Sequence, residues 1–199
     1  MVTARPRRRG DEDAPATTVY FGTRSAWRRW LRAHYKTARE IWLVYYKKGA
    51  GKPRIAYNDA VEEALCFGWI DSNLKSLDAE RFAQRFTPRK PGSAYSQANK
   101  ERLKGLLAAR KVSKAVLLDL PDLDSGHFEI AADILSAIRA HKAARHNFQG
   151  FSTSYKRIRI AFIEGARRRP QEFKKRLAYF IRMTEQNRQF GFGGIEKYY

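Results

Sequence analysis

Residues 69–89 read WIDSNLKSLDAERFAQRFTPR, and this stretch decides the fold. Two β-prone runs, 69–77 and 81–89, flank the short polar segment 78–80. Such a pattern is typical of a β-hairpin, in which a tight turn joins two antiparallel strands. The stretch therefore predicts a hairpin whose two arms share one small sheet.

The residues before the hairpin predict the rest of that sheet and its helices. Residues 41–46 (IWLVYY) are apolar on both faces, which indicates a buried central strand. Trp27, Leu31 and Tyr35 recur at nearly helical spacing and predict a helix. Asp59 resembles a helix N-cap, with Glu62 completing a capping box.

Changes of composition divide the chain into four parts. Residues 1–17 predict a disordered basic arm, because they are rich in Arg and lack hydrophobic periodicity. Residues 18–117 predict an α+β domain with a small antiparallel sheet and flanking helices. The segment 118–126 (LDLPDLDSG) is the best linker candidate, and residues 125–190 predict a helical C-terminal region. The Gly- and aromatic-rich ending, 191–199, predicts an irregular tail.

Positive charge dominates the composition. The 199 residues contain 40 Lys and Arg but 20 Asp and Glu, a formal charge of +20. Such a charge attracts nucleic acid, anionic lipid or acidic protein, whereas the alternative is a coding background rich in Arg. A single cysteine, Cys66, excludes an intramolecular disulfide. The sequence shows no complete export signal and no apolar run long enough for a membrane span, so we expect a cytoplasmic protein.

Several motifs around the hairpin resemble the YdeI/OmpD-associated family, which includes proteins named for bacteriocin protection. The matching pieces are AVEEALCFGWIDS at 60–72, RFTPRKPGSAYSQANK at 85–100 and IWLVYYKK at 41–48. The resemblance covers about residues 19–110 well and residues 128–189 more loosely. It implies a binding or protective factor, sometimes linked to outer-membrane proteins or cationic-peptide resistance, with no established catalytic residues. A periplasmic setting is suggested for part of the family.

An anion-binding site is one hypothesis for this central region. In the second arm of the hairpin, Phe82 and Phe86 alternate with cationic residues on the opposite face. The residues proposed to bind the anion are Arg85, Arg89, Lys90, Ser93 and Asn99. The alternative is that Asp71 or Asp78 pairs internally with one of the arginines. A pocket at Trp69, Asp71 and Arg85 would suit an uncharacterised enzyme.

Nucleic acid is the second class of partner that the charge allows. Basic residues alternate with aromatic ones in the C-terminal helices, and the N-terminal arm adds further arginines. The residues that would contact phosphates are Arg7, Arg8, Arg9, Lys156, Arg157, Arg159, Arg167, Arg168 and Arg169.

Catalytic and metal-binding patterns are weak by comparison. Cys66 lies in an apolar helical stretch and has no fixed relation to any histidine, which indicates a buried small side chain. His141 and His146 are five residues apart and would not share a helix face. We therefore expect no metal and no cofactor. The leading hypothesis is a non-enzymatic binding or protection protein that engages an anionic protein or ligand, with bacteriocin or envelope stress as its expected setting. The oligomeric state stays open.

Overall fold

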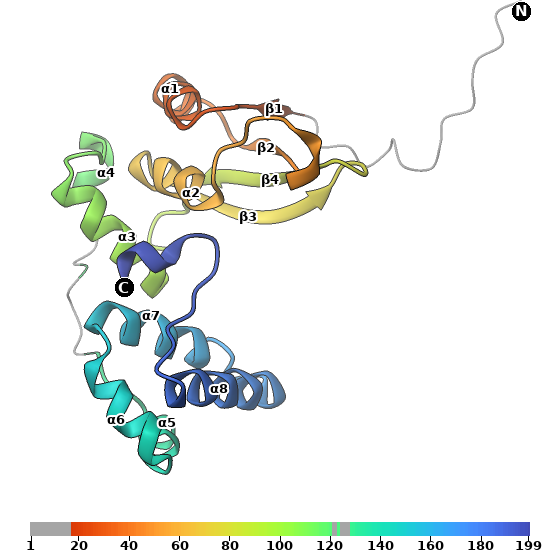
Figure 1. The fold of residues 1–199 in the computed structure, drawn as a ribbon. Helices are drawn as coiled ribbons and strands as arrows, with labels where there is room; N and C mark the ends of the chain where they lie inside the picture. Colours follow the sequence, from red (N-terminus) through yellow and green to blue (C-terminus); the bar gives the residue numbers. More distant parts are fainter. Residues whose placement is uncertain (1–16, 121–122, 124–127) are drawn as a thin grey trace, which may run out of the picture. The chain divides into compact units, whose positions relative to one another are not determined.

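The computed structural model describes residues 17–120, 123 and 128–199 (Figure 1). The chain divides into two compact units, one ending at Pro91 and the other beginning at Gly92. The predicted arm, except for its last residue, and most of the predicted linker lie outside the described residues. Among the described helices, none is long and apolar enough to cross a membrane.

The first unit is a four-stranded sheet with helices beside it. Its elements are β1 (Thr18–Tyr20), α1 (Arg24–His34), β2 (Ile41–Tyr46), the 3-10 helix η1 (Lys48–Ala50), α2 (Tyr57–Cys66), β3 (Trp69–Ser76) and β4 (Arg81–Pro88). The strand order is β1-β2-β4-β3. The predicted α+β class is confirmed, but the sheet is mixed, because β1 and β2 run parallel. Helix α1 supplies the crossover that a parallel pair requires.

The predicted hairpin is confirmed, and one side chain organises its turn. β3 and β4 pair antiparallel, with an irregularity between Asp71 and Leu74. The Asp78 carboxylate accepts hydrogen bonds from the backbone N–H groups of Glu80 (2.9 Å) and Arg81 (2.7 Å). An Asp that bonds the backbone two residues ahead stabilises a tight turn, so this residue fixes how the strands meet.

The core of this unit is aromatic. Trp27 is fully buried and stacks on Trp30, with ring centroids 5.4 Å apart. Trp30 in turn meets the edge of Trp69 at 5.8 Å. The fourth tryptophan, Trp42, lies on β2, so all four tryptophans of the chain belong to this unit. The predicted burial of the central strand is confirmed, since four of the six residues in 41–46 are buried.

The predicted capping box at the start of α2 is wrong. The helix begins at Tyr57, its N-cap residue is Ala56, and no side chain caps it. Asp59 lies inside the first turn, where its carboxylate accepts a hydrogen bond from Arg24 at 2.7 Å. Glu62 is buried and binds the same guanidinium at 2.9 Å. A partner from another helix, which local spacing does not reveal, determines the role of these acids.

The second unit is helical. Its elements are α3 (Gln97–Ala108), α4 (Lys114–Leu118), α5 (Ala132–Arg139), α6 (Lys142–Gly150), α7 (Thr153–Glu164), α8 (Pro170–Glu185) and the 3-10 helix η2 (Ile195–Tyr198). Helix α3 packs against α7 and η2. The compact unit therefore begins before the predicted linker and includes α3 and most of α4, which fall in the range predicted for the α+β domain. The C-terminal tail, which we expected to be irregular, contains η2.

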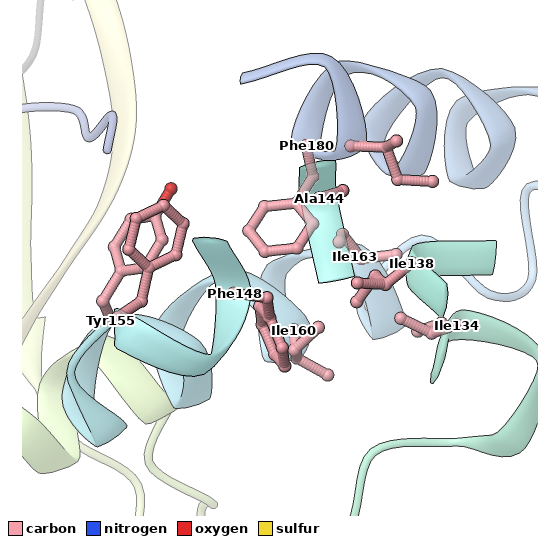
Figure 2. Packing of buried hydrophobic residues seen from close by; sticks show 10 residues of the cluster. Ile134, Ile138, Ala144, Phe148, Tyr155, Ile160, Ile163 and Phe180 are labelled. Atoms are coloured by element: carbon pink, nitrogen blue, oxygen red, sulfur yellow. The ribbon is translucent and has the colours of Figure 1, made fainter. Parts of the chain in front are cut away.

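The four helices α5 to α8 enclose the main core of this unit (Figure 2). Ile134 and Ile138 of α5, Phe148 of α6, Ile163 of α7 and Phe180 of α8 point into the space between the helices. Helix α7 is capped by Ser152, whose hydroxyl accepts a hydrogen bond from the backbone N–H of residue 155 at 3.1 Å. The cap and the core together fix which side chains α7 presents to α8.

Candidate functional site

The predicted anion-binding residues do not lie in one unit. Arg85, Arg89 and Lys90 belong to the first unit, and Ser93 and Asn99 belong to the second.

Arg85 and Asn99 each have an identified internal partner. Arg85 forms an ion pair with Glu40, whose carboxylate is 3.0 Å from the arginine Nε. Asn99 is buried, and its side-chain oxygen accepts a hydrogen bond from Arg102 at 3.0 Å. Arg85 is therefore paired internally, but with Glu40 and not with Asp71 or Asp78, the two acids that the alternative named. Asp78 pairs with Arg81.

The second predicted pocket contains a core residue. Trp69 is fully buried, and its indole N–H donates to the carbonyl oxygen of Tyr35 at 3.1 Å. Asp71 accepts a hydrogen bond from the Tyr57 hydroxyl at 2.7 Å. Both side chains hold local structure together.

Buried carboxylates in the first unit are also engaged. Glu62 and Glu63 are both buried, and Arg24 binds each of them, at 2.9 and 2.5 Å. Arg28 adds a second bond to Glu63 at 2.5 Å. Cys66 lies on the same helix, and burial raises the pKa of its thiol. A neutral buried thiol beside neutralised acids fits the small structural side chain that we predicted.

The residues predicted to contact nucleic acid lie in different environments. Lys156 donates to the carbonyl oxygen of Gln149 at 2.9 Å, and Arg157 lies 3.9 Å from a carboxylate oxygen of Glu101. Arg167 forms ion pairs with Asp133 and Glu164. Arg168 and Arg169 are exposed, whereas Arg159 is buried. Arg7, Arg8 and Arg9 lie outside the described residues.

Arg159 lines a cavity between α7 and α8. The cavity has a volume of about 330 Å³. Its lining residues are Arg159, Phe162, Ile163, Glu172, Lys175, Arg176, Tyr179, Phe180 and Phe190. Most of its wall is aromatic or aliphatic, with cations at a few points. A small apolar cavity with a few well-placed polar groups is typical of a ligand site.

The charge on Arg159 has no acidic partner among the described residues. Only 8% of the residue is exposed, and its Nε has no hydrogen-bond partner. The guanidinium instead faces aromatic rings, at 5.1 Å from the centroid of Phe190 and 5.7 Å from those of Phe162 and Tyr199. Cation–π contacts of this kind contribute about 0.5–2 kcal/mol, less than the cost of burying an unpaired charge. This arginine would be stabilised by an anion.

The nearby tyrosines do not supply that anion. Burial raises the pKa of Tyr155 and of Tyr199 to about 12, although the positive charge of Arg159 acts in the opposite direction on both. Both phenols therefore stay neutral at physiological pH. The hydroxyl of Tyr199 donates to the carbonyl oxygen of Phe190 at 2.7 Å. No internal phenolate balances the buried guanidinium.

The one carboxylate in the lining is occupied by a different arginine. Glu172 accepts a hydrogen bond from the Nε of Arg176 at 2.7 Å, and this bond holds the pKa of the carboxyl below its usual value. Arg176 also donates to the carbonyl oxygen of Phe162 at 2.7 Å and lies 3.8 Å from the centre of that ring. Arg159 and Lys175 therefore leave the lining with surplus positive charge.

The sequence reasoning missed this cavity. We expected Arg159 to contact phosphate, which requires an exposed side chain. The structure contradicts this, because Arg159 is buried, whereas Phe162 on the same helix is 48% exposed. A signal was present in the spacing: Tyr155, Arg159 and Ile163 recur every four residues on one helix face. An arginine in the middle of an apolar stripe indicates a buried cation.

Two family models match the chain. Residues 19–118, half of the sequence, match a domain of unknown function, DUF8412. The chain belongs to this family. In this DUF8412 protein, residues 127–187 match a second model, described as bacteriocin-protection, YdeI or OmpD-associated. No curated protein and no solved structure is significantly similar to the chain.

The predicted resemblance to the YdeI/OmpD-associated family is confirmed. The match lies in the helical region α5–α8, where we found the looser likeness. The motifs at 60–72 and 85–100 fall instead within the DUF8412 match. Every residue that lines the cavity, except Phe190, belongs to the YdeI/OmpD-associated region of this DUF8412 protein.

Proposed function

We propose that this DUF8412 protein is a non-catalytic binding protein of the YdeI/OmpD-associated type. It holds an anionic group of its partner against Arg159, in the cavity between α7 and α8. The single observation that carries the proposal is the burial of the Arg159 guanidinium without a carboxylate among the described residues. A buried charge is normally paired, so an arginine left without an acid favours an anion supplied from outside.

The lining of the cavity supports binding more than catalysis. Its nine residues include no histidine, cysteine or serine, and Arg176 engages its one carboxylate, Glu172, which leaves only Lys175 and Tyr179 as groups that could exchange a proton. General acid–base or nucleophilic catalysis requires a group that can exchange a proton or attack a substrate. Arginine instead binds carboxylates and phosphates through charge-assisted hydrogen bonds without reacting with them.

The family model suggests the setting in which such binding is used. Its description reads bacteriocin-protection, YdeI or OmpD-associated. We propose that this protein acts in bacteriocin or envelope stress. A strain that lacks the gene should lose survival under bacteriocin challenge, and the wild-type gene should restore it. If Arg159→Met restores survival equally well, the cavity has no part in protection.

Amide chemical shifts provide a direct test of anion binding. The wild-type protein, Arg159→Met and Arg168→Met are each titrated with acetate, inorganic phosphate and benzoate at constant ionic strength. Arg168 is exposed, so its substitution controls for the loss of one positive charge. We expect at least one anion to move the signals of α7 and α8 in the wild type and in Arg168→Met, but not in Arg159→Met. Equal shifts in all three proteins, or none in the wild type, would contradict the proposal.

Non-specific nucleic-acid binding is a second candidate, favoured by one other feature. A depression of about 380 Å³ on α6 is lined by Lys142, Arg145, His146 and Gln149, and no acid is among them. Phosphate contacts by such residues depend steeply on salt. A gel shift on random DNA should therefore appear at low salt and weaken in Lys142→Gln/Arg145→Gln. Absence of any shift at low salt would exclude this candidate.

A further inference from the structure

We infer that the ligand of the α7–α8 cavity is an aromatic monocarboxylate of one or two fused rings. The inference rests on the proposed function, because it specifies the part of the ligand that carries the anionic group. Three features of the cavity carry it: the geometry of its cation, the nature of its walls and its volume.

The cation suits a single carboxylate. Arg159 is the one cation in the lining that is both buried and without an acidic partner among the described residues. Arg176 is engaged by Glu172, and Lys175 is exposed to solvent. The planar guanidinium presents two parallel N–H groups to a carboxylate, which adds direction to the attraction between the charges. One buried positive charge matches one negative charge.

The walls suit an aromatic ring. Phe162 and Tyr179 are 48% and 41% exposed, although both are large hydrophobic side chains. Tyr179 meets Phe190 edge to face, with ring centroids 4.8 Å apart. A ligand ring can add to this arrangement by the same edge-to-face or offset geometry, which contributes beyond the burial of area. It would also cover apolar surface that is otherwise in contact with water.

The position of Phe162 is fixed before any ligand arrives. The Arg176 guanidinium lies against its ring and holds its backbone carbonyl, while Glu172 holds the guanidinium. A wall that is already ordered loses little side-chain entropy on binding. This favours a rigid, flat ligand, because such a ligand gains most from a surface that does not have to rearrange.

The volume sets the size of the ligand. The cavity measures about 330 Å³, at the lower end for small-molecule sites. An engineered protein cavity of about 150 Å³ holds one benzene molecule, so this cavity accommodates roughly two fused rings. A long acyl chain or a folded peptide segment would exceed it.

Calorimetric titration of the full chain with four matched compounds tests the ligand class. The compounds are 2-naphthoate, benzoate, cyclohexanecarboxylate and 2-naphthamide, at one pH and one ionic strength. Cyclohexanecarboxylate retains the charge and a ring of similar size without aromatic faces, and 2-naphthamide retains the rings without the charge. We expect 2-naphthoate to bind best, and benzoate to bind at least about threefold more tightly than cyclohexanecarboxylate.

Two variants test separately whether the carboxylate charge and the aromatic ring of the ligand are recognised. Arg159→Met should weaken 2-naphthoate binding about tenfold or more, the effect of losing a charge-assisted hydrogen bond. Phe162→Leu keeps an apolar side chain at an exposed position and should remove most of the preference for benzoate over cyclohexanecarboxylate. The controls are Arg168→Met and Phe192→Leu, both exposed and outside the lining. They should bind like the wild type.

The pattern of results distinguishes failure of the ligand class from failure of the proposed function. If cyclohexanecarboxylate binds as tightly as benzoate, the aromatic class is overturned while anion binding at Arg159 stands. If 2-naphthamide binds as tightly as 2-naphthoate, the charge is irrelevant and both proposals fail. If none of the four compounds binds, the aromatic monocarboxylate is overturned, and the titrations with acetate and inorganic phosphate decide whether Arg159 binds any anion.

Discussion

The guanidinium of Arg176 lies 3.8 Å from the centre of the Phe162 ring and donates a hydrogen bond to the carbonyl oxygen of the same residue. One side chain thereby joins α8 to the end of α7. Lysine carries the same charge but lacks the planar surface and the forked donors that make both contacts. The contact between Arg176 and Phe162 therefore requires an arginine, and a lysine of the same charge would not replace it.

We expect Arg176→Lys to lower the free energy of unfolding by about 1 kcal/mol, the contribution of a cation–π contact at a partly exposed site. The ring of Phe162 should also become more mobile, because its carbonyl and its face both lose a contact. Urea unfolding measures the first effect and ring relaxation by NMR the second. An unchanged midpoint with an unchanged slope would show that the stacking contributes no stability.

Arg24→Met should be far more disruptive. It leaves the buried carboxylates of Glu62 and Glu63 without their shared partner, and breaking a buried ion pair from one side costs about 3–5 kcal/mol. Arg29 lies on the same helix, exposed, and Arg29→Met should change stability by less than about 0.5 kcal/mol. Chemical denaturation of the two variants gives the comparison. Similar losses in both would mean that the cluster is not a source of stability.

Two neighbouring tyrosines should respond differently to removal of the hydroxyl. Tyr199 donates to the Phe190 carbonyl at 2.7 Å, so Tyr199→Phe should cost about 1 kcal/mol at neutral pH. The buried hydroxyl of Tyr155 has no such partner, and Tyr155→Phe should be neutral or slightly stabilising. Thermal and urea unfolding distinguish the two variants. The reverse order of stability would show that Tyr155, rather than Tyr199, holds a structural hydrogen bond.

Alkaline pH should destabilise the second unit. Burial raises the pKa of Tyr155 and Tyr199 from 10.0 to about 12, so the folded state keeps protons that the unfolded chain releases. Stability is therefore fully present below pH 10 and falls as the pH rises towards 12. Tyr155→Phe removes one of these groups and should flatten the decline. The measurement is the free energy of unfolding of both proteins across this range, and parallel curves would contradict the assignment.

The sequence pattern predicted those elements of the fold that interactions between residues close in sequence determine. The alternation in 69–89 and the turn at Asp78 specify the hairpin, and the apolar run 41–46 specifies a buried strand. The parallel pairing of β1 with β2 was not predictable, because β1 is only three residues long and carries no period of its own.

The candidate site depended on tertiary contacts that spacing does not encode. Asp59 and Glu62 have the spacing of a capping box, but Arg24 from another helix engages both. The spacing places Arg159 on an apolar face of α7, but only the packing of α8 and the C-terminal residues around it shows that its charge meets aromatic rings and no acid among the described residues. Charge counts indicate that cations are in surplus, whereas only the packing shows which of them is buried without an acid.

The placement of all four tryptophans in the first unit has a spectroscopic consequence. Light at the red edge of aromatic absorption excites indole alone, so the emission that follows belongs to the sheet unit. The helical unit, with the cavity, contributes only the weaker tyrosine bands. Tryptophan emission therefore follows the unfolding of the sheet unit separately from that of the helical unit.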